Sequence, residues 1–182
     1  LCQIEGVDDL TLTTNGFLLA EKAQALKNAG LQRITVSLDS LDDRVFARMN
    51  GRNFTTARIM AGINKAEQVG LRPIKINTVV QRNVNEHTLL DLARYFKGTG
   101  HIIRFIEYMD VGNCNHWEQT HVVPSSKIIQ NIHAQFPIEA TEPIVFGEVA
   151  KRYRFIDGKG EIGFITSISQ PFCQSCTRAR LS

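Results

Sequence analysis

The sequence contains no apolar run long enough to cross a membrane. Even its apolar segment Ile74–Val80 is interrupted by Lys75 and Asn77, whereas a membrane-spanning helix needs about 20 predominantly apolar residues. No charged, then apolar, then small-residue leader opens the chain. With 43% hydrophobic and 21% charged residues, the composition is that of a globular core rather than a disordered chain. We expect no membrane partner.

Cysteine is scarce and the net charge is small. The 182 residues include four cysteines, and a chain of this length buries enough surface to fold without disulfides. We therefore expect a reducing, cytoplasmic environment, in which Cys173 and Cys176 form a metal or redox pair. A net charge of +3 is too low to suggest nucleic-acid binding.

The excess positive charge lies in the last fifth of the chain. Residues 1–147 carry 15 basic and 15 acidic side chains, whereas residues 148–182 carry six and three. Arg178 and Arg180 would project to one side of an extended segment, which suits a clamp for phosphate or carboxylate. For residues 151–154, an ordinary solvated surface is an equal alternative.

Between residues 10 and 110, short β-rich runs alternate with helical patterns. The expected strands are residues 10–14, 33–39, 74–80 and 102–108. The expected helices are residues 18–29, a short helix capped by Asp42 or Asp43, a longer one capped by Thr55 or Thr56, and one capped by Asn85. This alternation predicts parallel βα units. An incomplete parallel β/α barrel is the first choice of fold, and an open doubly wound sheet is the second.

A different pattern begins after Asp110. We expect a helix over residues 125–136 and two β-like pieces at residues 152–156 and 161–167, joined by a hairpin turn. We place a boundary near residue 122, which divides the chain into residues 1–122 and 123–182.

Polar side chains lie at or near the end of each expected strand. They are Thr13, Ser37, Asp39, Lys75, Asn77, Arg104 and Glu107. Ligands of β/α folds bind at the C-terminal ends of the strands. Arg104 and Glu107 are three residues apart and so lie on opposite faces of their strand. Lys75 is costly to bury alone, so either a carboxylate such as Glu107 or a ligand phosphate should pair with it.

Cys173 and Cys176 could hold a zinc ion or part of an iron–sulfur cluster. Either site needs further ligands, which Cys2, Cys114 or a residue beyond Ser182 could supply. A module in which zinc only staples a hairpin is the non-catalytic alternative. A Schiff-base barrel that uses Lys75 is a weaker one.

Several motifs occur together in a recognisable order. They are residues 13–16, 36–39, 75–80, 104–112, 163–167 and 172–182. Together they resemble the family of molybdenum-cofactor biosynthesis protein A, radical S-adenosylmethionine (SAM) enzymes that act as GTP 3′,8-cyclases. The resemblance covers essentially the whole chain.

This resemblance implies an incomplete, TIM-barrel-like β/α barrel of the radical SAM type with a C-terminal iron–sulfur extension. It implies two [4Fe–4S] clusters, SAM as the source of a 5′-deoxyadenosyl radical, and GTP as the substrate, so that the radical arises on the cofactor and no side chain is singled out as catalytic. An electron donor and a downstream enzyme that accepts the cyclised product are implied partners. The oligomeric state is left open, a homodimer included.

Site residues follow motif by motif from the same resemblance. Ser37 and Met109 match SAM contacts, and Thr13 and Lys75 match GTP contacts. Arg178 and Arg180 match the triphosphate clamp, and Cys173 and Cys176 match two ligands of the second cluster. Asn77 and Arg104 are expected close by.

Two parts of the family pattern are missing from the sequence. The CxxxCxxC motif of the first cluster and the third cysteine of the second cluster are absent. We expect the chain to be a fragment that is inactive by itself. A radical SAM enzyme with another substrate is the alternative within the same superfamily.

Overall fold

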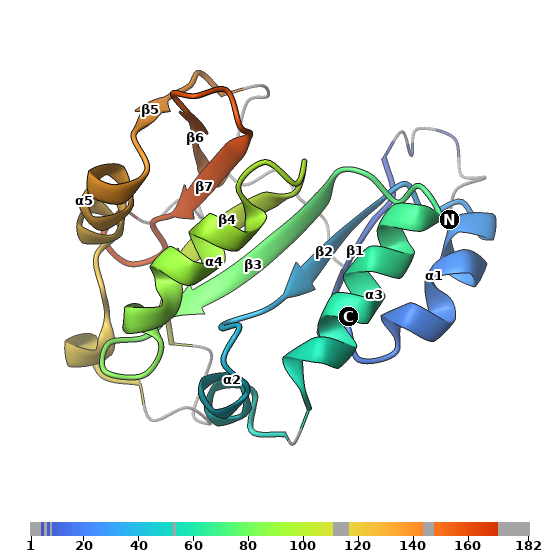
Figure 1. Cartoon of the computed structure of the whole chain (residues 1–182), viewed down its shortest axis with the longest axis horizontal. Helices are drawn as coiled ribbons and strands as arrows, with labels where there is room; N and C mark the ends of the chain where they lie inside the picture. The colour runs from blue at the N-terminus through green and yellow to red at the C-terminus, as the bar shows by residue number, and fades with distance from the viewer. Residues whose placement is uncertain are drawn as a thin grey trace.

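One seven-stranded sheet organises the part of the chain that the computed structural model describes, which is residues 5, 7, 9–52, 54–110, 117–143 and 148–170 (Figure 1). The strand order is β1-β2-β3-β4-β7-β6-β5. The strands are β1 (Thr11–Thr14), β2 (Arg33–Ser37), β3 (Ile74–Val80), β4 (Ile102–Glu107), β5 (Ile138–Ala140), β6 (Lys151–Phe155) and β7 (Glu161–Ile165).

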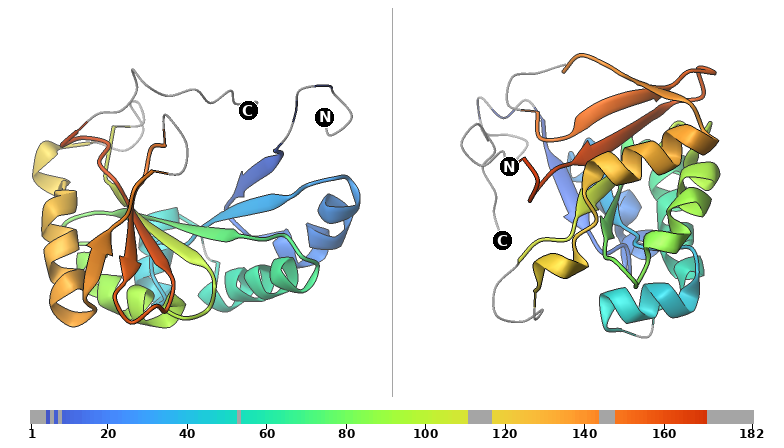
Figure 2. Two further views of the ribbon diagram at one scale, coloured as in Figure 1. Left: turned by 90° about the horizontal axis from the view of Figure 1, so that it is seen from above. Right: turned by 90° about the vertical axis from the view of Figure 1, so that its left-hand side faces the viewer.

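Helices cover one face of this sheet. They are α1 (Leu19–Asn28), α2 (Asp43–Asn50), α3 (Thr56–Gln68), α4 (Leu89–Phe96) and α5 (Ser125–Gln135), with 3₁₀ turns η1 (Glu86–Thr88) and η2 (Gln119–His121). Figure 2 (left) shows α1, α3 and α4 below the sheet, and none of the helices of the described residues lies above it. Helix α5 packs against α4, β4 and β7. A doubly wound sheet would carry helices on both faces, so that alternative is wrong.

The strand directions confirm the predicted βα units. Strands β1 to β4 pair in parallel with their neighbours, and β7 joins β4 in parallel. Strands β7, β6 and β5 pair in antiparallel fashion. The predicted hairpin turn between β6 and β7 is present, with Gly158 and Gly160 at positive φ of 74° and 104°, which glycine adopts without the strain of a Cβ.

The two faces of the sheet differ because side chains alternate along each strand. In β3, Ile74, Ile76, Thr78 and Val80 are buried on the helix side, whereas Lys75 and its alternate neighbours are only partly buried. The apolar core therefore lies between the sheet and the helices, where Ile34, Val36 and Ile76 are fully buried. The opposite face is left for polar residues.

Close packing at the end of β1 requires a glycine. Gly16 has φ +77°, and a Cβ there would lie 3.0 Å from both Val36 Cγ1 and Ile59 Cγ2. The sharp turn after β1 thus brings α1 close against the sheet and α3.

The predicted helix caps were only partly right. Asp42 caps α2, because its Oδ1 accepts the N–H groups of Arg44 and Val45. Thr55 precedes α3 without a side-chain cap bond. Asn85 stands at the N-cap position of η1 but makes no side-chain cap bond there either. Its buried amide accepts the Gln81 N–H and donates to the carbonyls of Asp39 and Val79. Strand β5 was not predicted.

None of the helices in the described residues is long and apolar enough to cross a membrane.

Candidate functional site

Three of the predicted site residues share the helix-free face of the sheet. Lys75 lies in register with Thr35 on β2, and Thr35 lies in register with Thr13 on β1. Ser37 is two residues beyond Thr35 on the same face. Since adjacent strands are about 4.8 Å apart, Thr13 and Lys75 are separated by about 10 Å across the sheet. This spacing is within reach of one small ligand.

A second polar row lies one step closer to the C-terminal ends of the strands. Asn77 is in register with Ser37 on one side and with Arg104 on the other. Within the described residues, no donor reaches the buried Oδ1 of Asn77. A buried carbonyl oxygen without a donor is unusual. The row therefore offers an acceptor suited to a ligand hydroxyl or amine.

The electrostatics of this face favour an anion. Burial, together with the positive charges of Arg104 and Arg33, lowers the pKa of Lys75 to about 8, against the opposing effect of Glu148 and Asp9. A bound anion would relieve both causes, because it would compensate the buried charge and shield it from the arginines.

A glycine makes room for the Arg104 side chain. Gly163 on β7 is in register with Arg104, and a Cβ at Gly163 would lie 3.2 Å from Arg104 Cγ. The aliphatic part of Arg104 therefore crosses β7 at the one position where no side chain blocks it. This contact fixes the position of a cation beside Asn77.

Asp39 joins the ends of two strands. Its Oδ1 accepts the N–H of Val79 at 2.8 Å. Burial raises the pKa of this carboxyl to about 6, although the Val79 hydrogen bond acts in the opposite direction. Asp39 does not cap the following helix, whose cap is Asp42. It ties β2 to β3 just beyond Ser37 and Asn77.

Glu107, the carboxylate that the sequence offered for Lys75 as an alternative to a ligand phosphate, does not pair with it. Glu107 is fully buried on the helix side of β4, where its carboxylate accepts hydrogen bonds from Ser125, Ile168 and Ser169. The alternation along β4 directs Glu107 away from Arg104 and the polar face, as the sequence spacing indicates.

The remaining predicted residues divide into two groups. Met109 follows β4 and is 39% exposed. Cys173, Cys176, Arg178 and Arg180 lie outside the described residues, as do Cys2 and Cys114. Among the residues that are described, no three or more His, Cys, Asp or Glu side chains come together as a metal site would require.

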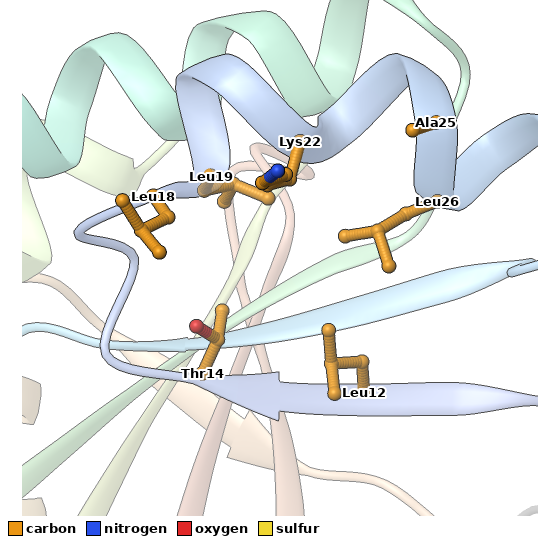
Figure 3. A pocket seen from close by; sticks show the side chains of 7 residues that line it. All are labelled: Leu12, Thr14, Leu18, Leu19, Lys22, Ala25 and Leu26. Atoms are coloured by element: carbon orange, nitrogen blue, oxygen red, sulfur yellow. The ribbon is translucent and has the colours of Figure 1, made fainter.

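A pocket of about 360 Å³ lies between β1 and α1 (Figure 3). Leu12 and Thr14 face it from the strand, while Leu18, Leu19 and Leu26 face it from the helix side. Thr13 alternates to the other side of β1. This apolar pocket is therefore separate from the polar face and does not suit a nucleotide.

Arg33 and Thr35 belong to the polar face but were not singled out from the sequence, and Gly163 was noted only as the first residue of the motif at residues 163–167, with no role given to it. Counting back by two from Ser37 would have found Thr35 and Arg33, because alternate residues share a face. Gly163 had no such signal, since its neighbour Arg104 is 59 positions earlier and only the β4–β7 pairing brings them together.

Family models match both parts of the chain. The model described as the radical SAM superfamily matches residues 1–96, and the model described as Molybdenum Cofactor Synthesis C matches residues 101–182.

Curated relatives match along the whole chain. The chain is similar to proteins named GTP 3′,8-cyclase from Xanthomonas axonopodis pv. citri (53% identity), Acidothermus cellulolyticus (49%) and Staphylococcus carnosus (48%), and each match covers all of this chain. The chain covers 54%, 50% and 53% of these relatives. It therefore spans about half the length of the curated relatives it matches.

One solved structure shares the fold. A radical SAM methyltransferase from Sphaerobacter thermophilus matches with a TM-score of 0.53 and 19% identity, over 68% of this chain and 36% of the methyltransferase. The mixed sheet with helices on one face is thus part of an incomplete β/α barrel, as predicted.

Proposed function

Because the chain belongs to the radical SAM superfamily, we propose that the complete protein that contains it is a GTP 3′,8-cyclase of molybdenum-cofactor biosynthesis. The observation that carries this proposal is the pair of polar rows on the helix-free face of the sheet. The names of the relatives that match over all 182 residues support the same activity.

Lys75 and Thr13 are proposed to hold GTP. They lie on one row of the polar face, and Arg104 adds a second cation on the next row. A triphosphate is the kind of anion that such a partly buried lysine needs. We propose that Arg178 and Arg180 complete the clamp for the triphosphate from the C-terminal segment.

Ser37 and Met109 are proposed to contact SAM. Asn77, whose Oδ1 has no hydrogen-bond partner in the described part of the chain, lies in register beside Ser37, and together they fit a ligand with neighbouring hydroxyl groups such as a ribose. When bound, SAM and its [4Fe–4S] cluster would supply the radical chemistry. This chain's own residues would hold SAM and GTP on adjacent rows and keep water away from the gap between them.

Further proposals concern the segment beyond residue 122 and the partners. We propose that residues 1–122 belong to the barrel and that residues 123–182 begin the region that binds a second [4Fe–4S] cluster through Cys173 and Cys176. A cytoplasmic location, an electron donor and an enzyme that consumes the cyclised product follow from the proposed activity, and the oligomeric state, a homodimer included, is left open.

The test is a binding and product assay on the complete protein purified without oxygen. We expect iron and sulfide without stoichiometric zinc, GTP binding, and cyclised product when SAM and a reductant are added. R178A and R180A should each weaken GTP binding by about tenfold, as expected for the loss of a charge-assisted contact. K127M removes an exposed lysine of α5 and should not change the affinity. Zinc without iron, or unchanged GTP affinity in both arginine variants, would refute the proposal.

A further inference from the structure

We propose that Glu107 is a positioning residue that fixes where the chain leaves the sheet toward Cys173, Cys176 and the two arginines. This inference rests on the proposed function. It assigns no contact with substrate to Glu107, which acts through the turn that follows β7.

The Glu107 carboxylate joins two segments that are far apart in sequence. One oxygen, Oε1, accepts the N–H of Ser125 at 2.7 Å and the hydroxyl of Ser169 at 2.6 Å. The other, Oε2, accepts the N–H groups of Ile168 and Ser169 at 2.9 and 2.8 Å. The start of α5 and the turn after β7 are therefore both attached to the end of β4.

All four donors to the Glu107 carboxylate are neutral N–H and O–H groups. Within the described residues its negative charge is therefore stabilised by hydrogen bonds and not by an ion pair. Glu107 is fully buried, and burial alone would raise its pKa. Hydrogen bonds from Ser169, Ser125 and Ile168 outweigh burial and hold the pKa of this carboxyl below its ordinary value. The group is thus ionised at neutral pH, and a buried carboxylate of this kind depends on keeping its donors in place.

The start of α5 explains why Glu107 accepts a hydrogen bond from Ser125. Pro124 precedes the helix and provides no side-chain cap, so Glu107 satisfies the N–H of Ser125 from a distant strand. A carboxylate is also favourable near the positive end of a helix. This contact holds Glu107 rigidly, and the rigid carboxylate can then define the position of the turn.

The turn leads directly to the residues proposed to bind the second cluster and GTP. Ser169 precedes Cys173 by four residues and Arg178 by nine. A second contact, from the Ser167 hydroxyl to the Glu107 carbonyl at 3.4 Å, reinforces the attachment. Since the residues proposed to bind GTP follow this turn in the sequence, we expect a shift of the turn to weaken GTP binding, because small displacements of binding groups are costly to a site that needs several contacts at once.

The experiment compares E107Q with wild type in the complete protein. Glutamine has nearly the same shape but presents an NH₂ donor where a carboxylate oxygen accepted two donors. E142Q removes an exposed carboxylate and is the matched control, and S169A removes one of the four hydrogen bonds. The measurements are hydrogen exchange of peptides covering residues 166–170, the dissociation constants of GTP and SAM, and the melting temperature.

We expect hydrogen exchange in the turn to become about tenfold faster in E107Q, because its amides lose a charged acceptor. Peptides from β3 should exchange as in wild type. The dissociation constant of GTP should rise about tenfold in E107Q, which loses the charged acceptor, and about threefold in S169A, which loses one donor. The dissociation constant of SAM should stay within about threefold of the wild-type value, and E142Q should match wild type in every one of these measurements.

Two outcomes would overturn the inference. One is unchanged turn exchange or unchanged GTP affinity in E107Q. The other is an equal loss of GTP and SAM with a large fall in melting temperature, which would show a purely structural role. If the wild-type protein binds no GTP, the proposed function fails instead, and the exchange of residues 166–170 still decides whether Glu107 holds the turn.

Discussion

Replacing Lys75 with methionine is expected to stabilise the fold while it weakens GTP binding. Lys75 is partly buried on β3, where burial and the charges of Arg104 and Arg33 lower its pKa from 10.5 to about 8. A lysine with a lowered pKa holds its proton less well in the folded protein than in the unfolded chain. The charged form therefore destabilises the fold, and methionine keeps the apolar stem without the charge.

The magnitude follows from the change in proton affinity. At about 1.4 kcal/mol for each tenfold change in the proton-binding constant, a pKa that falls from 10.5 to about 8 gives an upper bound of about 3.5 kcal/mol. Because the side chain is only partly buried, solvent screening reduces this bound to about 1–2 kcal/mol. K75M should gain this much in free energy of unfolding near neutral pH.

The direction in which the stability difference between wild type and K75M changes with pH makes the prediction specific. Between about pH 8 and 10.5 the unfolded state binds more protons at this position, so the stability of the wild type rises with pH relative to K75M. The difference between the two proteins should thus be largest near neutral pH and shrink toward about pH 10.5. Urea unfolding of both proteins across this range measures it, and K127M, at an exposed lysine of α5, should show no such trend.

Two results would refute this reasoning. If K75M is less stable than wild type near neutral pH, the charged form of Lys75 does not destabilise the fold. If the difference is the same at every pH, the lowered pKa of Lys75 is not its cause. GTP binding supplies an independent check: since an anion binds the protonated amine, affinity in the wild type should fall as pH rises through about 8, and K75M should lack this dependence.

Three further predictions concern the fold. G16A should lower the free energy of unfolding by about 1–3 kcal/mol more than G51A does. Both glycines have positive φ, but only a Cβ at Gly16 would meet neighbouring atoms, at 3.0 Å. Equal losses of stability in urea unfolding would contradict this. D42A should cost about 1 kcal/mol in urea unfolding, the typical value of a lost helix cap, whereas T55A should cost almost nothing because Thr55 makes no cap bond. D39N should stabilise the fold by about 1–2 kcal/mol near pH 7.5 and by nothing near pH 4. The reason is that the folded pKa of about 6 lies above the ordinary value of 3.8, so that Asp39 destabilises the fold only where it is ionised. A stabilisation that persists at acid pH in thermal unfolding would rule out this cause.

Much of the candidate site could be predicted from alternation along the strands. The period of two in β3 places Lys75 and Asn77 on one face and Ile74 and Ile76 on the other, and the structure confirms this division. Ser37 and Thr13 follow by the same rule. Their mutual distance could not be predicted in this way, because it depends on which residues of neighbouring strands pair.

What the sequence by itself determined is therefore local: the strands β1 to β4, a cap at Asp42 or Asp43, and the opposite faces of Arg104 and Glu107. These features depend on residues only a few positions apart. The tertiary structure alone decided where Asn85 and Glu107 bond, since the partners of Glu107 lie 18 to 62 positions away. It also decided that Gly163 lies beside Arg104. A buried polar group takes whichever donor or acceptor the packing brings to it, and that choice exists only once distant strands and helices have met.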